Sequence, residues 1–322
     1  MKITIKTLAE YAGVSIGTVS RALNNDPLIA KATRERIHRL ASDLNYVPNF
    51  TGKALQSSKS YLIGYLLPNT YVSFYNEIIQ GISSVTMSKR YGLLLGLTGE
   101  DTRAESEQLR IFQEKNVDGI LVSTYCRENI RQLRSIQESG IPLVACDIRS
   151  FDPSVPEVIV NEEKAAELVV KHLSALKCEQ SAYCFLKNEN GKERFDLINI
   201  LLAKKGKRPL LPCRDLDQLN VLMRSKKKPA AIICYSDMIA VEVIQALKKL
   251  KLTVPSDVSV IGFDDMFFAA WPELGITTIA QPKVSLGTLA AETLFRLIDT
   301  RKSARSIYIE PTLVERSSSR KV

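Results

Sequence analysis

Apolar residues between positions 5 and 44 recur at the three- and four-residue spacing of short amphipathic helices. The spacing predicts one helix ending near residue 12, a second from 16 to about 23, and a third over 31–44. Gly13 suits a tight turn between the first two, and Ser15 suits the N-cap of the second. The inner faces comprise Leu8, Ala9 and Ala12, then Val19, Ala22 and Leu23, then Ile37, Leu40, Ala41 and Leu44.

The outer surface of the second helix is small and polar, with a single basic side chain. Thr18, Ser20 and Arg21 point outward, while Ile16 and Gly17 lie at the leading end. Such a surface suits the edges of bases in the major groove of DNA. The stretch therefore predicts a helix-turn-helix, and an ordinary helical hairpin is the alternative that this pattern alone leaves open.

From Tyr61 onward, short apolar runs typical of buried strands alternate with amphipathic stretches typical of helices. The alternation predicts an α/β fold of parallel sheets covered on both faces. Two tandem units, near 61–160 and 161–282, predict two lobes with a ligand-binding cleft beyond the carboxyl ends of the strands. The predicted strands are 62–67, 93–97, 119–122, 143–146, 158–160, 182–186, 231–234, 258–263 and 277–279, and the helices include 105–115, 165–176 and 240–250.

Charge favours an anionic partner. The chain has 322 residues and a formal net charge of +9, which is consistent with two or three domains. Residues 1–58 contain eight basic and four acidic side chains, so the net positive charge per residue is higher there than in the remainder. Nucleic acid is the partner that this charge balance suggests.

The six cysteines form no C-x-x-C pair, and most lie in apolar strand-like runs. We therefore expect free thiols in a reducing compartment rather than disulfides or a metal site. Residues 1–6 lack the apolar core of a signal peptide, and no apolar run is long enough to span a membrane. The expectation is a soluble, cytoplasmic protein without a membrane partner.

Catalytic motifs are not found in the sequence. His38 and His172 lie in amphipathic helical stretches, and there is neither a phosphate-binding glycine loop nor a G-x-S-x-G elbow. Asp264 and Asp265 are neighbours at a strand end and point in different directions. No catalytic residue, metal site or cofactor is predicted, and the protein is not expected to be an enzyme.

Motifs along nearly the whole chain resemble those of the lactose-repressor (LacI) family of bacterial transcription regulators. In the first 49 residues they are T-I-K-T-L-A at 4–9, A-G-V-S at 12–15, T-V-S-R-A-L-N at 18–24, T-R-E-R-I at 33–37 and L-N-Y-V-P-N at 44–49. Later matches include I-G-Y-L-L-P at 63–68, N-V-D-G-I-L-V at 116–122, I-P-L-V-A-C-D at 141–147, V-S-V-I-G-F-D-D at 258–265, T-T-I-A-Q-P at 277–282 and L-V-E-R at 313–316.

The resemblance implies a domain organisation. Residues 1–46 would form an all-α DNA-binding headpiece, 47–60 a hinge, and 61–322 a two-lobed core like the periplasmic sugar-binding proteins. The first lobe would comprise about 61–160 and 283–302, and the second about 161–282 and 303–322. In the family the hinge folds as a helix on operator DNA and inserts a leucine into the minor groove, where Leu55 falls here. A plain tether is the alternative.

The family binds a pseudo-palindromic operator as a dimer, and we expect Arg21 to contact a guanine. Ile16 and Gly17 occupy the family's specificity positions, so base readout there must be apolar. The chain ends without leucine heptads, so no coiled coil joining dimers is expected. The implied DNA-binding residues are Thr4, Ser15, Ile16, Gly17, Thr18, Ser20, Arg21, Asn24, Thr33, Tyr46, Asn49 and Leu55.

The family also implies a small-molecule effector, a sugar or sugar derivative, in the cleft between the lobes. Trp271 would stack on its ring or pack in a lobe core, two equal alternatives. Departures from the family pattern at 69–73, 177–178 and 187 leave open the ligand class, whether a ligand binds, and the choice between induction and co-repression. The expected effector-binding residues are Phe74, Asp147, Arg149, Arg194, Asp237, Trp271 and Asp264.

Two functional classes other than a regulator are open to a chain of this pattern. A periplasmic sugar-binding module is disfavoured by the missing signal peptide and by the basic first segment. A cytoplasmic α/β enzyme acting on a sugar is disfavoured by the lack of a nucleophile paired with a base. Substitution of Arg21 separates the three, because only the regulator depends on it for DNA binding.

Overall fold

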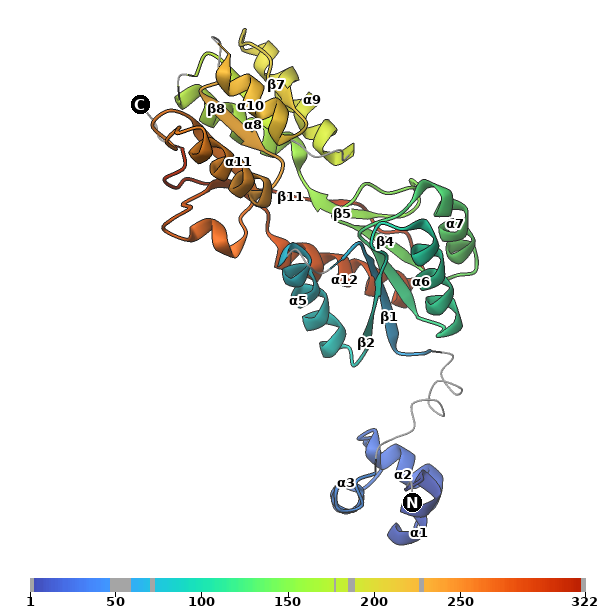
Figure 1. Ribbon diagram of the computed structural model, residues 1–322. Coiled ribbons are helices and arrows are strands. Elements are labelled where there is room, and N and C mark those ends of the chain that lie inside the picture. The colour runs from blue at the N-terminus through green and yellow to red at the C-terminus, as the bar shows by residue number, and fades with distance from the viewer. Residues whose placement is uncertain are drawn as a thin grey trace. The chain divides into compact units, whose positions relative to one another are not determined.

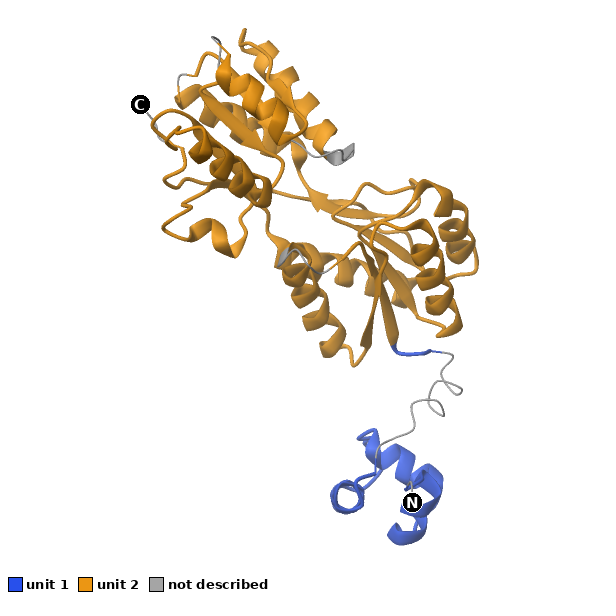
Figure 2. Ribbon diagram, viewed as in Figure 1, with its two compact units in different colours: residues 1–61 blue, residues 62–322 orange. Residues whose placement is uncertain are grey.

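The structure is a computed structural model that describes residues 3–46, 59–69, 73–176, 178–184, 189–225 and 229–319. The chain divides into two compact units, residues 1–61 and 62–322 (Figure 2). Within the described residues, no helix has both the length and the apolar character needed to cross a membrane.

The first unit contains helices α1 (Ile5–Ala12), α2 (Ile16–Leu23) and α3 (Lys31–Asp43), as the sequence pattern predicts. Gly13 adopts the left-handed conformation (φ 64°) that ends α1, which most other residues adopt only with strain. Ser15 caps α2 by accepting a hydrogen bond from the amide of Thr18 at 3.1 Å. The small core comprises Leu8, Ala9, Ala12, Val19, Ala22, Ile37 and Ala41.

The second unit begins with a parallel sheet of strand order β11-β5-β4-β3-β1-β2 (Figure 1). Helices α5 and α12 pack on one face, and α6 and α7 pack on the other. Its elements are β1 (Leu62–Leu67), α5 (Ser73–Ser88), β2 (Gly92–Leu97), α6 (Thr102–Glu114), β3 (Gly119–Val122), η1 (Arg127–Asn129), α7 (Ile130–Glu138), β4 (Leu143–Cys146), β5 (Glu157–Val160), α12 (Lys283–Thr300) and β11 (Ile307–Ile309).

A second sheet has the order β12-β10-β9-β8-β6-β7, and only β12, at one edge, is antiparallel to its neighbour. Helices α8 and α9 cover one face, and α10 and α11 cover the other. Its elements are α8 (Glu162–Ala175), β6 (Ser181–Cys184), α9 (Glu189–Lys204), β7 (Leu211–Cys213), α10 (Leu216–Arg224), β8 (Ala231–Cys234), α11 (Asp237–Lys249), β9 (Ser259–Asp264), η2 (Phe267–Ala270), β10 (Thr277–Ala280) and β12 (Thr312–Val314).

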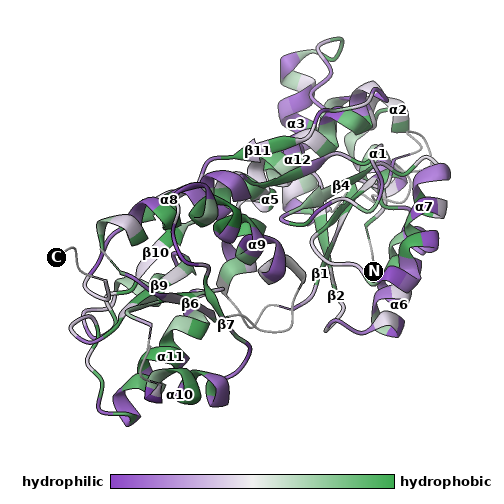
Figure 3. Ribbon diagram, turned by 90° about the horizontal axis from the view of Figure 1, so that it is seen from above, coloured by the Kyte–Doolittle hydropathy of each residue, from purple (hydrophilic) through white to green (hydrophobic). Residues whose placement is uncertain are grey.

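Strand β8 shows why these runs are continuously apolar. Ile232 and Cys234 pack with α10 and α11, while Ala231 and Ile233 pack with α8 and α9. Alternate side chains thus enter opposite buried layers, so neither face requires polar residues. Figure 3 shows the consequence, with hydrophobic residues along β1 and β4 and mixed hydropathy along the helices α6 and α7.

The chain passes between the sheets after β5, after β10 and after β11. Ile307 pairs with Val158 in the first sheet, so 307–309 lie in the first lobe and not, as expected for all of 303–322, in the second. Strands β7, β11 and β12 were not predicted, because runs of three residues at sheet edges carry little apolar pattern. The six cysteines are free thiols, as expected.

Candidate DNA-binding surface and ligand cleft

The exposed face of α2 is the candidate DNA-reading surface. Ile16 is 47% exposed, Gly17 and Arg21 are also exposed, and Thr18 and Ser20 are partly exposed. The Arg21 Nε donates to the carbonyl oxygen of Gly17 at 3.3 Å, and Arg21 forms no ion pair among the described residues. A cationic fork at the edge of a helix can therefore reach a guanine edge or a phosphate.

Two arginines of α3 bond to backbone carbonyl oxygens at the ends of α1 and α2, a contact that the sequence pattern does not predict. Arg36 Nη2 donates to the carbonyl oxygen of Ala12 at 2.9 Å, where α1 ends. Arg34 Nη1 donates to the carbonyl oxygen of Asn25 at 3.1 Å, just beyond α2. A basic side chain satisfies the terminal carbonyls of a helix and complements its dipole. Their signal was present as basic positions of α3, but their partners depend on tertiary packing.

The other predicted DNA-binding residues have varied local roles. Thr4 caps α1, and the Asn24 side-chain amide donates to the carbonyl oxygen of Ser20 at 2.9 Å. Thr33 is partly exposed, whereas Tyr46 packs against the core of the first unit. Asn49 and Leu55 lie outside the described residues.

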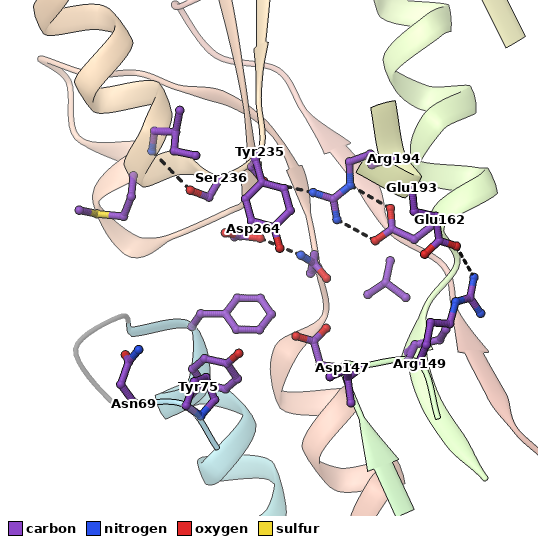
Figure 4. Close-up of a pocket in the computed structure, with 18 of the residues that line it drawn as sticks. Asn69, Tyr75, Asp147, Arg149, Glu162, Glu193, Arg194, Tyr235, Ser236 and Asp264 are labelled. Carbon is purple, nitrogen blue, oxygen red and sulfur yellow. Dashed lines mark hydrogen bonds and ion pairs between the residues drawn. The ribbon is translucent and has the colours of Figure 1, made fainter. Parts of the chain in front are cut away.

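A cavity of about 360 Å³ lies between the two lobes of the second unit (Figure 4). It opens at the carboxyl ends of β1, β4 and β5 in the first sheet, and of β8, β9 and β10 in the second. The structure brings five expected effector-binding residues together in its wall: Phe74, Asp147, Arg149, Arg194 and Asp264. It adds residues not predicted, including Tyr75, Glu162, Glu193, Tyr235 and Ser236.

Arg194 is only 4% exposed, and each nitrogen of its guanidinium donates a hydrogen bond. Nε and Nη2 donate to the Glu162 carboxylate at 2.9 and 2.7 Å, and Nη1 donates to the carbonyl oxygen of Tyr235 at 3.1 Å. The guanidinium also lies over the ring of Phe263, 3.3 Å from its centroid. Burial disfavours the charge, but Glu162 outweighs it and holds the pKa of Arg194 above its ordinary value.

Arg149 joins the two lobes. Its Nη1 donates to Glu157 of the first sheet at 3.0 Å, and its Nη2 donates to Glu193 of α9 at 2.8 Å. The second contact crosses the cleft, since α9 belongs to the second lobe. Ion pairs of this kind can bias the separation of two lobes, although partial exposure limits their strength.

Asp147 and Asp264 project into the cavity from opposite lobes, after β4 and at the end of β9. Asp264 is 9% exposed, and its Oδ1 accepts a hydrogen bond from Gln281 Nε2 at 2.7 Å. Burial is the main cause that raises both pKa values, that of Asp147 to about 7 and that of Asp264 well above its ordinary value. Glu162 raises the Asp147 pKa further, while Arg194 lowers both.

Two of the expected effector-binding residues, Asp237 and Trp271, do not line the cavity. Asp237 is fully buried beneath the cavity wall, where its Oδ2 accepts a hydrogen bond from the amide of Met266 at 2.7 Å. A carboxylate at a helix start readily takes such a structural role, and the neighbouring Ser236 lines the cavity instead. Trp271 is 51% exposed beside Phe267, so it neither lines the cavity nor lies in a lobe core.

Three family models together match most of the chain. Residues 4–49 match "Bacterial regulatory proteins, lacI family", and 60–194 match "Periplasmic binding proteins and sugar binding domain of LacI family". Residues 170–319 match "Periplasmic binding protein-like domain". The HTH-type transcriptional regulator RegA of Clostridium saccharobutylicum is 30% identical over 332 residues, covering 99% of each chain. The chain belongs to the lacI family.

Other relatives agree with this membership. The HTH-type transcriptional repressor PurR of Vibrio vulnificus is 30% identical over 99% of each chain. The lac repressor dimer bound to operator and an anti-inducer has the same fold, with a TM-score of 0.87 at 22% identity over 99% of each chain. This lacI-family protein is accordingly a DNA-binding transcription regulator with a periplasmic-binding-protein-like core, and the resemblance inferred from its motifs is confirmed.

Proposed function

We propose that this protein represses transcription by binding a pseudo-palindromic operator as a dimer, under the control of a small molecule held between its lobes. The observation that carries the proposal is the capped, exposed face of α2 on a unit that matches the lacI-family model. Relatives named as repressors support the direction of control, among them PurR and the ribose operon repressor of Haemophilus influenzae.

Within this proposal, the side chains of the first unit divide between reading and positioning. Arg21 contacts a guanine through a bidentate pair of hydrogen bonds, and Ile16 meets the methyl group of a thymine. Thr4, Ser20 and Thr33 hold phosphates and so fix the register on the duplex. Asn49 and Leu55 belong to the proposed hinge, residues 47–60, between the headpiece and the core.

The cavity is proposed as the effector site, for a sugar or sugar derivative. The ion pair between Arg149 and Glu193 crosses the cleft, so it would form or break as the separation of the lobes changes. A ligand that binds the closed lobes more tightly than the open ones shifts that equilibrium, and with it the affinity for operator. The family consists of transcription regulators, so we propose that the cavity acids bind rather than catalyse, with no metal or cofactor. The protein would act in the cytoplasm, where the operator lies.

Selection of duplexes from a random pool by the purified protein, at fixed salt, tests the proposal. We expect enrichment of a pseudo-palindrome whose half-sites lie a whole number of helical turns apart. Arg21→Ala should abolish enrichment, while Arg39→Ala, an exposed arginine on α3, should keep the selected sequence. No enrichment, even after repetition with a mixture of sugar metabolites, would contradict a sequence-specific regulator.

A further inference from the structure

Both cations in the cavity wall are already neutralised by neighbouring carboxylates. Arg194 forms a two-bonded pair with Glu162, and Arg149 pairs with Glu157 and Glu193. Each guanidinium keeps N–H donors beyond these bonds, but its positive charge is already offset by a carboxylate at hydrogen-bond distance. A bare phosphate or carboxylate is consequently a poor fit for this cavity.

Two acidic side chains in the cavity wall lack a directly bonded counterion, although the charge of Arg194 acts on both through space. Among the described residues, neither Asp147 nor Asp264 forms an ion pair, and Asp264 accepts only the neutral amide of Gln281 on its side chain. Lys283 lies close by, but its Nζ donates to the backbone carbonyls of Asp264 and Asp265 and pairs with Glu77 at 3.2 Å. Its charge is thus held behind the cavity wall.

The rim adds negative charge rather than relieving it. Glu100 and Glu242 are exposed acids that line the cavity mouth from the first and the second lobe. No lysine lines the cavity, as far as the described residues go. The wall as a whole therefore carries an excess of carboxylates, which attracts cations and focuses them toward the interior.

Aromatic side chains close the same space. Phe74 and Tyr75 lie at the start of α5, with their rings edge to face and the ring centroids 5.4 Å apart. Tyr235 follows β8 in the opposite lobe and also lines the cavity. In Figure 4 the labelled Tyr75 and Tyr235 approach the cavity from the two lobes, with Asp147 and Asp264 beside them. Ring faces attract an ammonium group through their quadrupole, so they reinforce the two carboxylates.

We propose that the ligand of this cavity carries a positively charged nitrogen, as an amino sugar does, and that Asp147 and Asp264 bind this nitrogen together. The proposal rests on the cavity being the effector site. Because the carboxylates come from opposite lobes, a cation between them replaces repulsion with two charge-assisted hydrogen bonds. The ligand would therefore favour closed lobes over open ones, which is the differential affinity that a switch requires.

Matched pairs of compounds that differ in an amine test the proposal. The pairs are D-glucosamine and D-glucose, D-galactosamine and D-galactose, and 1,4-diaminobutane and 1,4-butanediol, titrated calorimetrically into the full chain at equal ionic strength. We expect the amine of at least one pair to bind about tenfold more tightly than its neutral partner. Asp147→Asn and Asp264→Asn should each weaken that amine by about 10- to 100-fold.

Asp217→Asn, which removes an exposed carboxylate from α10, should leave the affinity of the amine unchanged. If Asp264→Asn fails to fold, Asp147→Asn alone decides, since no hydrogen bond of the Asp147 side chain within the described residues is lost. Equal or tighter binding of the neutral partner in every pair would overturn the proposal, as would the absence of binding by all three amines. Operator selection by the same preparation keeps the outcomes separate, because it tests the regulator and not the ligand class.

Discussion

Arg194 and Glu162 form a two-bonded ion pair at the edge of the ligand cleft, with Nε and Nη2 donating at 2.9 and 2.7 Å to the carboxylate. Arg194 is the arginine expected from the sequence to contact the effector. Its partner Glu162 comes from the first turn of α8 and accepts from two of its N–H donors, and the carbonyl oxygen of Tyr235 accepts from a third. The pair therefore fixes the Arg194 side chain in the cavity wall and offsets its positive charge.

Removing the carboxylate from this pair should destabilise the core. Glu162→Ala leaves the buried guanidinium of Arg194 without its counterion, so we expect the free energy of unfolding to fall by about 3 kcal/mol. Denaturant titration measures the loss, and Glu163→Ala, at the exposed neighbouring position, is the matched control. Equal stability of the two variants would mean that water replaces Glu162 without cost.

Stability should depend on pH through Asp147. Its pKa is about 7 in the fold, because burial and Glu162 disfavour the anion, while Arg194 opposes them and Asp264 faces it across the cavity. The folded chain thus binds more protons than the unfolded chain between pH 4 and 7, and the contribution of Asp147 to stability falls as pH rises through this window.

Asp147→Asn removes that dependence, so we expect it to raise the free energy of unfolding at pH 8 by about 1 to 2 kcal/mol and to change it little at pH 4. Melting temperatures at both pH values measure the effect, with Asp217→Asn as the control for a general change of charge. A parallel loss of stability at both pH values would show that Asp147 is a packing residue instead.

The N-cap of α2 should matter to DNA binding as well as to folding. Ser15→Ala removes the acceptor for the amide of Thr18, and we expect the first unit to lose about 1 kcal/mol. Amide hydrogen exchange measured in the full chain should become faster in α1, α2 and α3 but not in the second unit, residues 62–322. Ser42→Ala, at an exposed serine within α3, is the control and should leave the exchange rates unchanged. Unchanged rates in Ser15→Ala as well would contradict the prediction and mean that water replaces the Ser15 hydroxyl as acceptor for the Thr18 amide.

Close packing of α5 against α12 should make Gly287 irreplaceable. An added Cβ there would lie 2.0 Å from the carbonyl oxygen of Ile78, a backbone atom that cannot move aside. Gly287→Ala should therefore cost about 2 to 3 kcal/mol of unfolding free energy. Gly17→Ala, whose Cβ would meet nothing closer than 3.8 Å, is the control and should be tolerated. Thermal unfolding of both variants compares them directly.

Local pattern alone determined the helices of the headpiece, the capped turn at Gly13 and Ser15, and most strands of both sheets. These features depend on the spacing of apolar residues and on contacts within one helical turn, so a short contiguous stretch of sequence is enough to predict them. The strand end at 258–263 likewise predicts that Asp264 faces the cleft, and the family resemblance predicts Asp147 there; both line the cavity. The short edge strands were not predicted from the sequence. Strand β11 (Ile307–Ile309), for example, forms through its pairing with β5, which no local pattern indicates.

Tertiary structure alone decided what each cleft residue does. Asp237 follows β8 and Trp271 follows η2, yet Asp237 is buried with a hydrogen bond from the Met266 amide, and Trp271 is half exposed outside the cavity wall. The partners of Arg194 and Arg149 come from α8, α9 and β5, segments whose approach no local pattern encodes. Charge compensation acts through space and not along the chain, so the excess of carboxylates in the cavity emerges only once the lobes are folded together.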